Sequence, residues 1–208
     1  MARYTGPRWK LCRREGMDLF SRGAYGARAE SPLHRKDYPP GMHAMSRRKI
    51  TEYGLRLREK QKLKRIFGVL ERQFSRYFKE ADRLKGNTGE NLLMLLERRL
   101  DNVVVTSGFA LTLAQARQFV CHGHFLVNGK RVDIPSFQVK IGDVVEPRQR
   151  ENTRKLVSQH IDLNKSGFVP DWLEVNADTM TAKIVGHPTR ADFPFPIQEH
   201  LIVELCSK

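Results

Sequence analysis

Residues 112–145 constrain the fold more than any other part of this chain of 208 residues. Thr112 and Gln115 have the spacing of a capping box, in which each side chain satisfies a backbone N–H group at the start of a helix. The apolar pattern that follows predicts a short helix through Val120. Gly123 suits the left-handed residue that ends such a helix. A helix therefore opens this stretch.

A small antiparallel sheet is expected directly after this helix. Phe125–Val127 has the composition of a strand. Asn128-Gly129 is a strong hairpin signal, because its tight turn needs positive φ at both residues. The chain is expected to return as a strand over 132–134, and a second hairpin is expected over 139–145 around Gly142-Asp143. Such short connections predict antiparallel pairing.

Residues 46–80 have the periodicity of one amphipathic helix. Ser46 is a suitable N-cap, and Thr88 is expected to cap the next helix after the break at Gly86 and Gly89. The apolar residues form one stripe and are expected to be core: Leu63, Ile66, Phe67, Leu70, Phe74, Tyr77 and Phe78.

The two ends of the chain have weaker patterns. Residues 1–45 contain Gly, Pro and basic residues without a period, which indicates an arm that becomes ordered on a partner, apart from a short helix near 11–15. Strands are expected over 172–175 and 183–185, and a closing helix over 197–206.

Positive charge is concentrated in the first part of the chain. Residues 1–80 contain 21 Lys and Arg against 8 Asp and Glu, a net charge of +13, whereas residues 81–208 contain 16 against 15, a net charge of +1. Such an excess causes self-repulsion that a polyanionic partner relieves. Nucleic acid is the expected partner, and an anionic membrane surface is the alternative. The longest strongly apolar run, residues 92–96, is too short to cross a bilayer.

These patterns predict an α+β protein with an extended N-terminal arm, a helical domain and a small α/β RNA-binding domain that contains an antiparallel sheet. The arm is assigned to residues 1–45. The helical domain is assigned to 46–97, with the C-terminal residues 190–208 packed back on it. The α/β domain is assigned to 98–189, with the helix–hairpin module over about 98–160.

Motifs throughout the chain occur in the order of a known family. They begin with Ala2-Arg-Tyr-Thr-Gly-Pro7 and continue at 10–16, 57–62, 68–74, 88–90, 95–97, 99–104, 116–118, 122–125, 127–129, 134–136 and 199–205. Together they resemble the bacterial-type small-subunit ribosomal protein S4 family over nearly the whole chain.

The resemblance implies a structural protein of the small ribosomal subunit that binds a helix junction in the five-prime domain of the rRNA early in assembly. Members lie beside ribosomal protein S5 and other small-subunit proteins, near the channel through which messenger RNA enters, and that interface is linked to translational accuracy. It implies no enzymatic activity, no small-molecule substrate and no membrane partner. The implied location is the cytoplasmic ribosome, with an organelle ribosome as the alternative.

Cationic and polar side chains are expected to contact RNA in three places: the arm, the basic face of the 46–80 helix, and the corner between the short helix and the hairpin. Arg117 and Gln118 are expected on the exposed side of that helix. Basic residues hold phosphates without reading bases, and corner residues meet a folded RNA together. The expected contacts are Arg3, Arg8, Lys10, Arg13, Arg14, Arg47, Arg48, Lys49, Tyr53, Arg56, Lys60, Lys64, Arg99, Arg117, Gln118, His122, His124, Asn128 and Lys130.

No cofactor and no metal are expected. Many family members carry four N-terminal cysteines that hold zinc, but here only Cys12 remains, with Trp9 and Ser31 at the places of two others. One thiolate cannot make a four-ligand zinc site. Thr106 and Leu113 also stand where members often carry basic residues, so the usual RNA contacts at these positions are not carried over.

An RNA-modifying enzyme is the alternative in another class. Arg99-Leu-Asp101 superficially matches a catalytic motif of pseudouridine synthases. The residue before it is Arg98, where those enzymes commonly have Gly, and a synthase domain does not fit in the rest of the chain. The sequence shows no nucleophile–base pattern and no Gly-rich phosphate loop. Asp101 is therefore expected to cap or pair locally.

Overall fold

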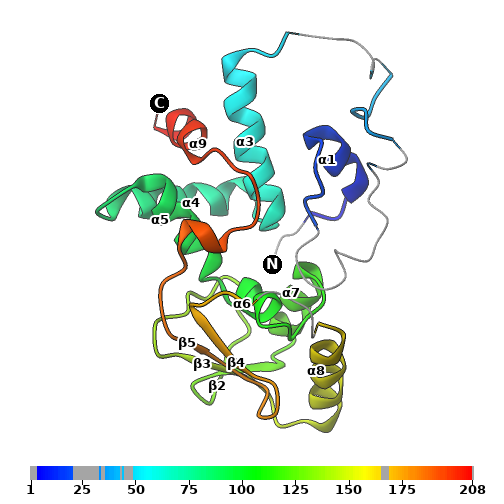
Figure 1. The fold of residues 1–208 in the computed structure, drawn as a ribbon, viewed down its shortest axis with the longest axis vertical. Helices are drawn as coiled ribbons and strands as arrows, with labels where there is room; N and C mark the ends of the chain where they lie inside the picture. Colours follow the sequence, from blue (N-terminus) through cyan, green and yellow to red (C-terminus); the bar gives the residue numbers. More distant parts are fainter. Residues whose placement is uncertain are drawn as a thin grey trace. The chain divides into compact units, whose positions relative to one another are not determined.

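The computed structural model describes residues 4–20, 33, 36–42, 44, 49–164 and 169–207 (Figure 1). These residues form two compact units, and the division falls within helix α5 (Thr88–Glu97). We call the first unit the helical unit; it consists of the described residues from 4 to 92 and of residues 194–207. We call 93–164 and 169–193 the sheet unit.

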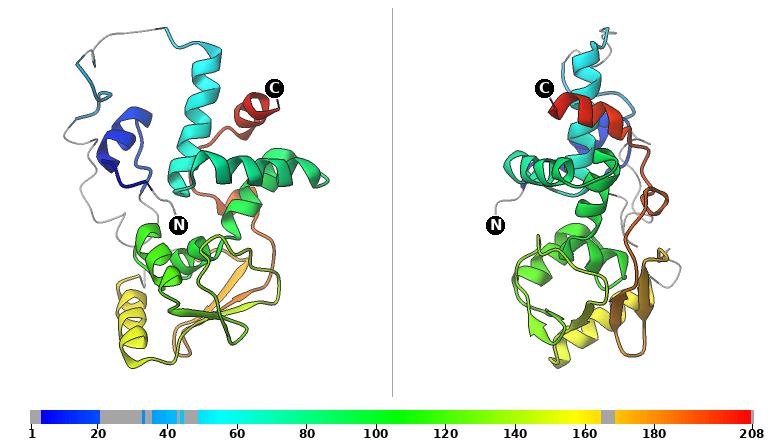
Figure 2. Two further views of the ribbon diagram at one scale, coloured as in Figure 1. Left: turned by 180° about the vertical axis from the view of Figure 1, so that it is seen from behind. Right: turned by 90° about the vertical axis from the view of Figure 1, so that its left-hand side faces the viewer.

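The helical unit contains α1 (Arg8–Glu15), α3 (Glu52–Ile66), α4 (Glu71–Arg83) and α9 (Glu199–Cys206), with the first half of α5. Helices α1 and α9 each pack against α3, and both views of Figure 2 show α9 beside it. The predicted closing helix is therefore confirmed. The buried apolar side chains of the helical unit include Leu63, Ile66, Phe67, Phe74, Phe78, Leu92, Phe195 and Ile202.

The expectation of one helix over 46–80 is wrong. Within the described residues this helix begins at Glu52, because the Oγ1 atom of Thr51 accepts a hydrogen bond from the N–H group of Gly54 at 3.2 Å. The expected N-cap, Ser46, lies outside the described residues. The next helix is also capped one residue earlier than expected, since the N–H group of Gly89 donates to Asn87 Oδ1 at 2.9 Å.

The break between α3 and α4 is a Schellman motif at Gly68, whose φ is 58°. The N–H group of Gly68 donates to the carbonyl of Arg65 at 3.1 Å, and that of Val69 donates to the carbonyl of Lys64 at 2.8 Å. The apolar stripe continues across this break, so its period alone does not reveal that the chain turns there.

We expect Gly68→Ala to lower the free energy of unfolding by about 1 kcal/mol, because an L side chain is strained at positive φ. The urea midpoint of the full chain measures the effect. An unchanged midpoint would contradict the role given to this glycine.

The sheet unit contains α6 (Leu100–Thr106), α7 (Leu113–Cys121), α8 (Glu151–Leu163) and a five-stranded sheet. The strand order is β2-β1-β3-β5-β4, and every neighbouring pair is antiparallel. The strands are β1 (Phe125–Val127), β2 (Lys130–Arg131), β3 (Val144–Pro147), β4 (Leu173–Asn176) and β5 (Thr181–Ile184). A short 3-10 helix, η1 (Arg190–Asp192), follows the sheet. The fold class is α+β, as predicted.

One apolar core joins the sheet to α6, α7 and α8. The rings of Phe109 and Phe125 stack within it, with centroids 6.1 Å apart. Further members come from every layer: Leu100, Val104, Ala116, Val120, Val145, Val157, Trp172, Leu173 and Ile184. This core holds α7 and the first hairpin in one rigid body.

The predicted start of α7 at Thr112 and the turn of the first hairpin are confirmed. Thr112 Oγ1 accepts from the N–H group of Gln115 at 3.2 Å, while Gln115 Oε1 accepts from the N–H group of Leu111 at 2.9 Å. The φ values of Asn128 and Gly129 are 50° and 72°, which is the tight turn that this pair predicts. The strand pair expected near 172–185 is also confirmed, as β4 and β5.

The expectation of a second hairpin over 139–145 is wrong, because the strand β3 pairs with β1 and β5 and not with residues 139–141. Val139 instead bonds to Arg98: its N–H group donates to the Arg98 carbonyl at 3.0 Å, and its carbonyl accepts from Arg98 Nε at 2.9 Å. The strand that returns from the first turn is only Lys130–Arg131, shorter and earlier than expected. Helix α8 was not predicted.

Candidate nucleic-acid interface

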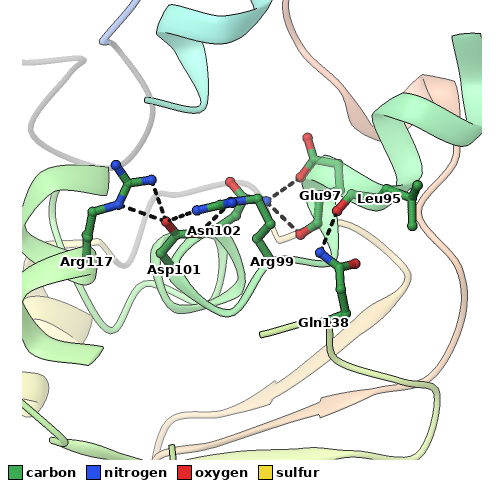
Figure 3. Close-up of polar contacts among 7 residues, drawn as sticks. All are labelled: Leu95, Glu97, Arg99, Asp101, Asn102, Arg117 and Gln138. Carbon is green, nitrogen blue, oxygen red and sulfur yellow. Dashed lines mark hydrogen bonds and ion pairs between the residues drawn. The ribbon is translucent and has the colours of Figure 1, made fainter. Parts of the chain in front are cut away.

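A buried ion network joins α6 to α7 (Figure 3). The carboxylate of Asp101 accepts from Arg99, with Nη2 2.6 Å from Oδ2 and Nε 3.0 Å from Oδ1. It also accepts from Arg117, whose Nη2 and Nε lie 2.8 and 3.1 Å from Oδ2. Asp101 therefore pairs locally, as expected. Two guanidinium groups share one carboxylate away from water, where solvent screens their interaction little.

This network changes the role of two residues that were expected to contact RNA. The Arg99 side chain is 0% exposed, so the expectation that it binds RNA is wrong. The Arg117 side chain is 12% exposed and turns toward Asp101, so its expected place on the exposed side of α7 is also wrong. Both guanidinium groups instead hold α7 against the start of α6 through the carboxylate of Asp101.

A second set of hydrogen bonds joins α6, and the loop that contains Phe137 and Gln138, to the end of α5 and the start of α6 (Figure 3). Asn102 Nδ2 donates to the buried Glu97 carboxylate at 2.6 Å, and Gln138 Nε2 donates to the carbonyl of Leu95 at 3.0 Å. The N–H group of Leu100 donates to the carbonyl of Phe137 at 2.9 Å. These bonds hold residues 137 and 138 beside the end of α5 and the start of α6.

The corner between α7 and β1 is a second Schellman motif. Gly123 has a φ of 68°, and its N–H group donates to the carbonyl of Val120 at 2.8 Å. The N–H group of His124 donates to the carbonyl of Phe119 at 3.0 Å, and the two rings meet edge to face at 5.4 Å. The motif thus sets the direction in which the chain leaves α7.

The corner presents several of the expected side chains at its surface. Gln118 and His122 are exposed at the end of α7, Lys130 is exposed on β2, and His124 is half-buried. Asn128 is exposed as a residue, but its amide is engaged: Nδ2 donates to Asp143 Oδ1 at 2.8 Å, and Oδ1 accepts from the N–H group of Val144 at 2.9 Å. The Asn128 side chain therefore links the turn after β1 to the start of β3.

Acidification should destabilise the fold through His124. Burial, and then the charges of His122, Arg150 and Arg148, lower the pKa of His124 below its ordinary value of 6.5. A base whose pKa is lowered by folding contributes stability above its unfolded pKa and loses it as the pH falls through the folded pKa. We therefore expect a lower urea midpoint at pH 5.5 than at pH 7.5, with a smaller difference in His124→Gln. An equal pH dependence in the variant would contradict this assignment.

Most of the expected cations on α3 are paired with carboxylates of the chain itself. Arg56 lies 2.6 Å from Glu204 and 3.2 Å from Glu52. Lys60 and Lys64 lie 2.5 and 2.6 Å from the two oxygens of Glu71. These three basic side chains are at most 23% exposed. The predicted basic face of α3 is therefore largely neutralised by the fold.

Two other expected residues near α3 stay accessible. Tyr53 is 64% exposed in the first turn of the helix. Lys49, just before the helix, is also exposed. Arg47 and Arg48 lie outside the described residues.

Helix α4 carries exposed cations that were not among the expected contacts. Arg72, Arg76 and Lys79 are exposed, and none pairs with a carboxylate of the described residues. Their spacing of four and three residues places them on one face, opposite the buried Phe74 and Phe78. This spacing is visible in the sequence and could have identified them. We call Arg72, Arg76 and Lys79 the α4 stripe.

The arm residues divide into two kinds. Arg8 and Lys10 are exposed on α1. Arg13 Nε donates to the carbonyl of Tyr38 at 3.0 Å, and Arg14 Nη2 donates to the carbonyl of Pro40 at 3.2 Å. Arg13 and Arg14 therefore join α1 to residues 38–40 within the arm. Arg3 lies outside the described residues.

The cysteine of the arm is buried, and its thiol donates weakly to Asp18 Oδ1 at 3.9 Å. Burial raises the pKa of the Cys12 thiol. Within the described parts of the chain, no three His, Cys, Asp or Glu side chains come together as a metal site.

No helix among the described residues is long and apolar enough to span a membrane.

The fold and its surface together define a class of protein. A helix–hairpin module with an exposed polar corner is combined with a separate helical unit that carries unpaired cations, an arrangement suited to binding folded RNA through its backbone and shape.

Comparison with known proteins identifies the family. Residues 3–97 match the model of the ribosomal protein S4/S9 N-terminal domain, and residues 98–145 match that of the S4 domain. Proteins named small ribosomal subunit protein uS4 from Thermoanaerobacter sp. (strain X514), Pelobacter propionicus and Thermodesulfovibrio yellowstonii are 55%, 52% and 51% identical to this chain, with full coverage of both sequences in each case. The chain belongs to the ribosomal protein S4 family. It is a ribosomal RNA-binding protein and not an enzyme.

Proposed function

We propose that the chain is a structural component of the small ribosomal subunit that binds its rRNA at a helix junction in the five-prime domain, early in assembly. The observation that supports this proposal best is the α4 stripe. Three exposed cations lie on one helical face, and none of them forms an ion pair with a carboxylate of the described residues. Such charges are costly for an isolated protein and suit an RNA backbone.

The division into two units suits a junction as the target. The helical unit offers the α4 stripe with Lys49, Arg8 and Lys10, and the sheet unit offers Gln118, His122 and Lys130 at its corner. Cations that meet phosphates release condensed counterions, which provides affinity without base readout. Two rigid bodies that each hold one stretch of RNA would stabilise the angle between RNA helices.

The expected neighbours belong to the same proposal. The curated relatives are named as small-subunit proteins, which supports the location in that subunit. Contact with ribosomal protein S5, a position near the channel through which messenger RNA enters, and a contribution to translational accuracy are proposed from the family resemblance.

Reconstitution onto naked small-subunit rRNA tests early binding. We expect the purified protein to join this rRNA with a stoichiometry of one before any other ribosomal protein is added, because its cations face RNA directly. The sedimentation profile of the complex measures incorporation. Incorporation only after other proteins have bound would contradict the proposed early role.

A further inference from the structure

The surface beside His124 in the sheet unit carries a group of basic side chains that were not among the expected contacts. Arg148 and Arg150 follow β3, and Arg131 lies at the end of β2. They surround the turn at Gly123 that ends α7. We call His122, Gly123, His124, Arg131, Arg148 and Arg150 the His124 corner.

Backbone bonds bring the members of the corner together. The N–H group of Arg148 donates to the carbonyl of His124 at 2.7 Å, which fixes the chain after β3 beside the end of α7. The guanidinium group of Arg131 lies directly against Gly123, in the space that a Cβ atom would fill. The rings of His122 and His124 lie 6.1 Å apart. Glycine is therefore required here both for its positive φ and for the approach of Arg131.

The charge of this corner is not neutralised by the described residues. Arg148 is half-buried and Arg150 is exposed, and neither pairs with a carboxylate in the described part of the chain. Glu151, the next residue, pairs with Lys155 at 2.6 Å instead. The carboxylate of Asp133 reaches Arg131 only at 4.0 Å, with both side chains more than half exposed. Arg148 and Arg150, which form no ion pair within the described residues, therefore favour a bound anion.

We propose that the His124 corner binds a phosphate group of the RNA backbone, and that an imidazole of the corner takes up a proton when it does so. This inference rests on the proposed function and deepens it by naming one phosphate site in the sheet unit. The guanidinium groups supply fixed charge and donors, and the glycine allows Arg131 to approach the turn closely.

The charges around His124 explain the coupling to protons. The charges of Arg148 and Arg150 after β3 and of His122 after α7 act on His124. Thr153 Oγ1 of α8 lies 3.0 Å from the Nδ1 atom of His124, and the ring of Phe119 in α7 meets it edge to face. In the free protein burial, and then these charges, lower the pKa of His124. A phosphate placed among them reverses the local charge and favours the protonated ring. RNA affinity should therefore rise as the pH falls.

A pair of charge-matched variants tests the phosphate site. Arg148→Gln/Arg150→Gln removes two cations of the corner, whereas Lys155→Gln/Lys183→Gln removes two exposed cations elsewhere in the sheet unit. We expect the first to weaken binding to a five-prime-domain rRNA fragment roughly 10- to 100-fold at ~0.1 M salt and to lower the slope of log affinity against log salt by about 2. The control should change affinity less than about threefold. Equal affinities for the two variants would overturn the site.

Measuring RNA affinity at several pH values separates the effect of histidine protonation from that of the fixed arginine charges. We expect the affinity of the wild-type protein to rise between pH 7.5 and pH 6.0, and His122→Gln/His124→Gln to remove most of that rise. The same rise in this variant would overturn the role of the imidazoles. Urea midpoints confirm that each variant is folded. A wild-type protein that fails to bind the fragment would overturn the proposed function together with this site, whereas a wild type that binds with an unaffected arginine variant overturns the site alone.

Discussion

Asp101→Ala is expected to lower the free energy of unfolding by about 3–5 kcal/mol, one of the largest effects of any single substitution in this chain. The substitution removes the carboxylate shared by Arg99 and Arg117, and the Arg99 side chain is fully buried. Deleting one partner from a buried ion pair leaves charge in a region of low dielectric, which costs far more than an exposed pair is worth. The urea midpoint, followed by circular dichroism, measures the change.

Asp133→Ala provides the matched control. Its carboxylate is 58% exposed and lies 4.0 Å from Arg131, so we expect a change of less than about 0.5 kcal/mol. Asp101→Asn should also destabilise the protein, because the amide keeps the shape of the side chain but carries no charge. A midpoint for Asp101→Ala within the range of the Asp133 control would show that the buried network does not hold α7 in place.

Removing the α4 stripe is expected to weaken rRNA binding by about 100- to 1,000-fold at ~0.1 M salt. Removal of one phosphate-binding cation costs about tenfold in affinity under these conditions, because the corresponding counterion is no longer released. The triple variant Arg72→Gln/Arg76→Gln/Lys79→Gln leaves the buried face of the helix untouched, since Phe74 and Phe78 point away from the stripe. Titration of labelled rRNA fragment with the protein measures the decrease.

A variant with the same decrease in charge tests whether it matters which cations are removed. Lys60→Gln/Lys64→Gln/Arg83→Gln also removes three charges, but these cations already pair with Glu71 and Glu80. We expect its affinity to fall by less than about tenfold. Equal decreases for the two triple variants would show that overall charge, and not unpaired cations, determines binding.

Local signals predicted the parts of the fold whose cause lies within a few residues. The turn at Asn128-Gly129 forms because these two residues tolerate positive φ, and α7 begins at Thr112 because its side chain caps the helix. The helix after residue 46 shows the limit of periodicity. Its apolar stripe suits α3 and α4 equally, and only the left-handed Gly68 separates them.

The candidate site depended on contacts between residues far apart in the sequence. Arg56 was expected to face RNA, but its partner Glu204 lies 148 residues further along the chain. Arg117 was expected on the exposed side of its helix, yet its guanidinium group donates to Asp101, which lies 16 residues earlier in the chain. Charge patterning shows where cations occur, whereas the fold determines which of them remain available. The α4 stripe, by contrast, follows from helical spacing alone.

The selectivity of rRNA binding tests the central claim most directly. The full chain would be titrated against a five-prime-domain rRNA fragment and against an unrelated RNA duplex of equal length, each at 50 and 200 mM salt. We expect affinity for both to fall steeply with salt, because phosphate contacts dominate, and we expect the fragment to remain preferred at 200 mM because both units contact its folded shape. Equal binding to the two RNAs, disappearing together at 200 mM, would contradict recognition of a junction and leave only a general attraction to RNA.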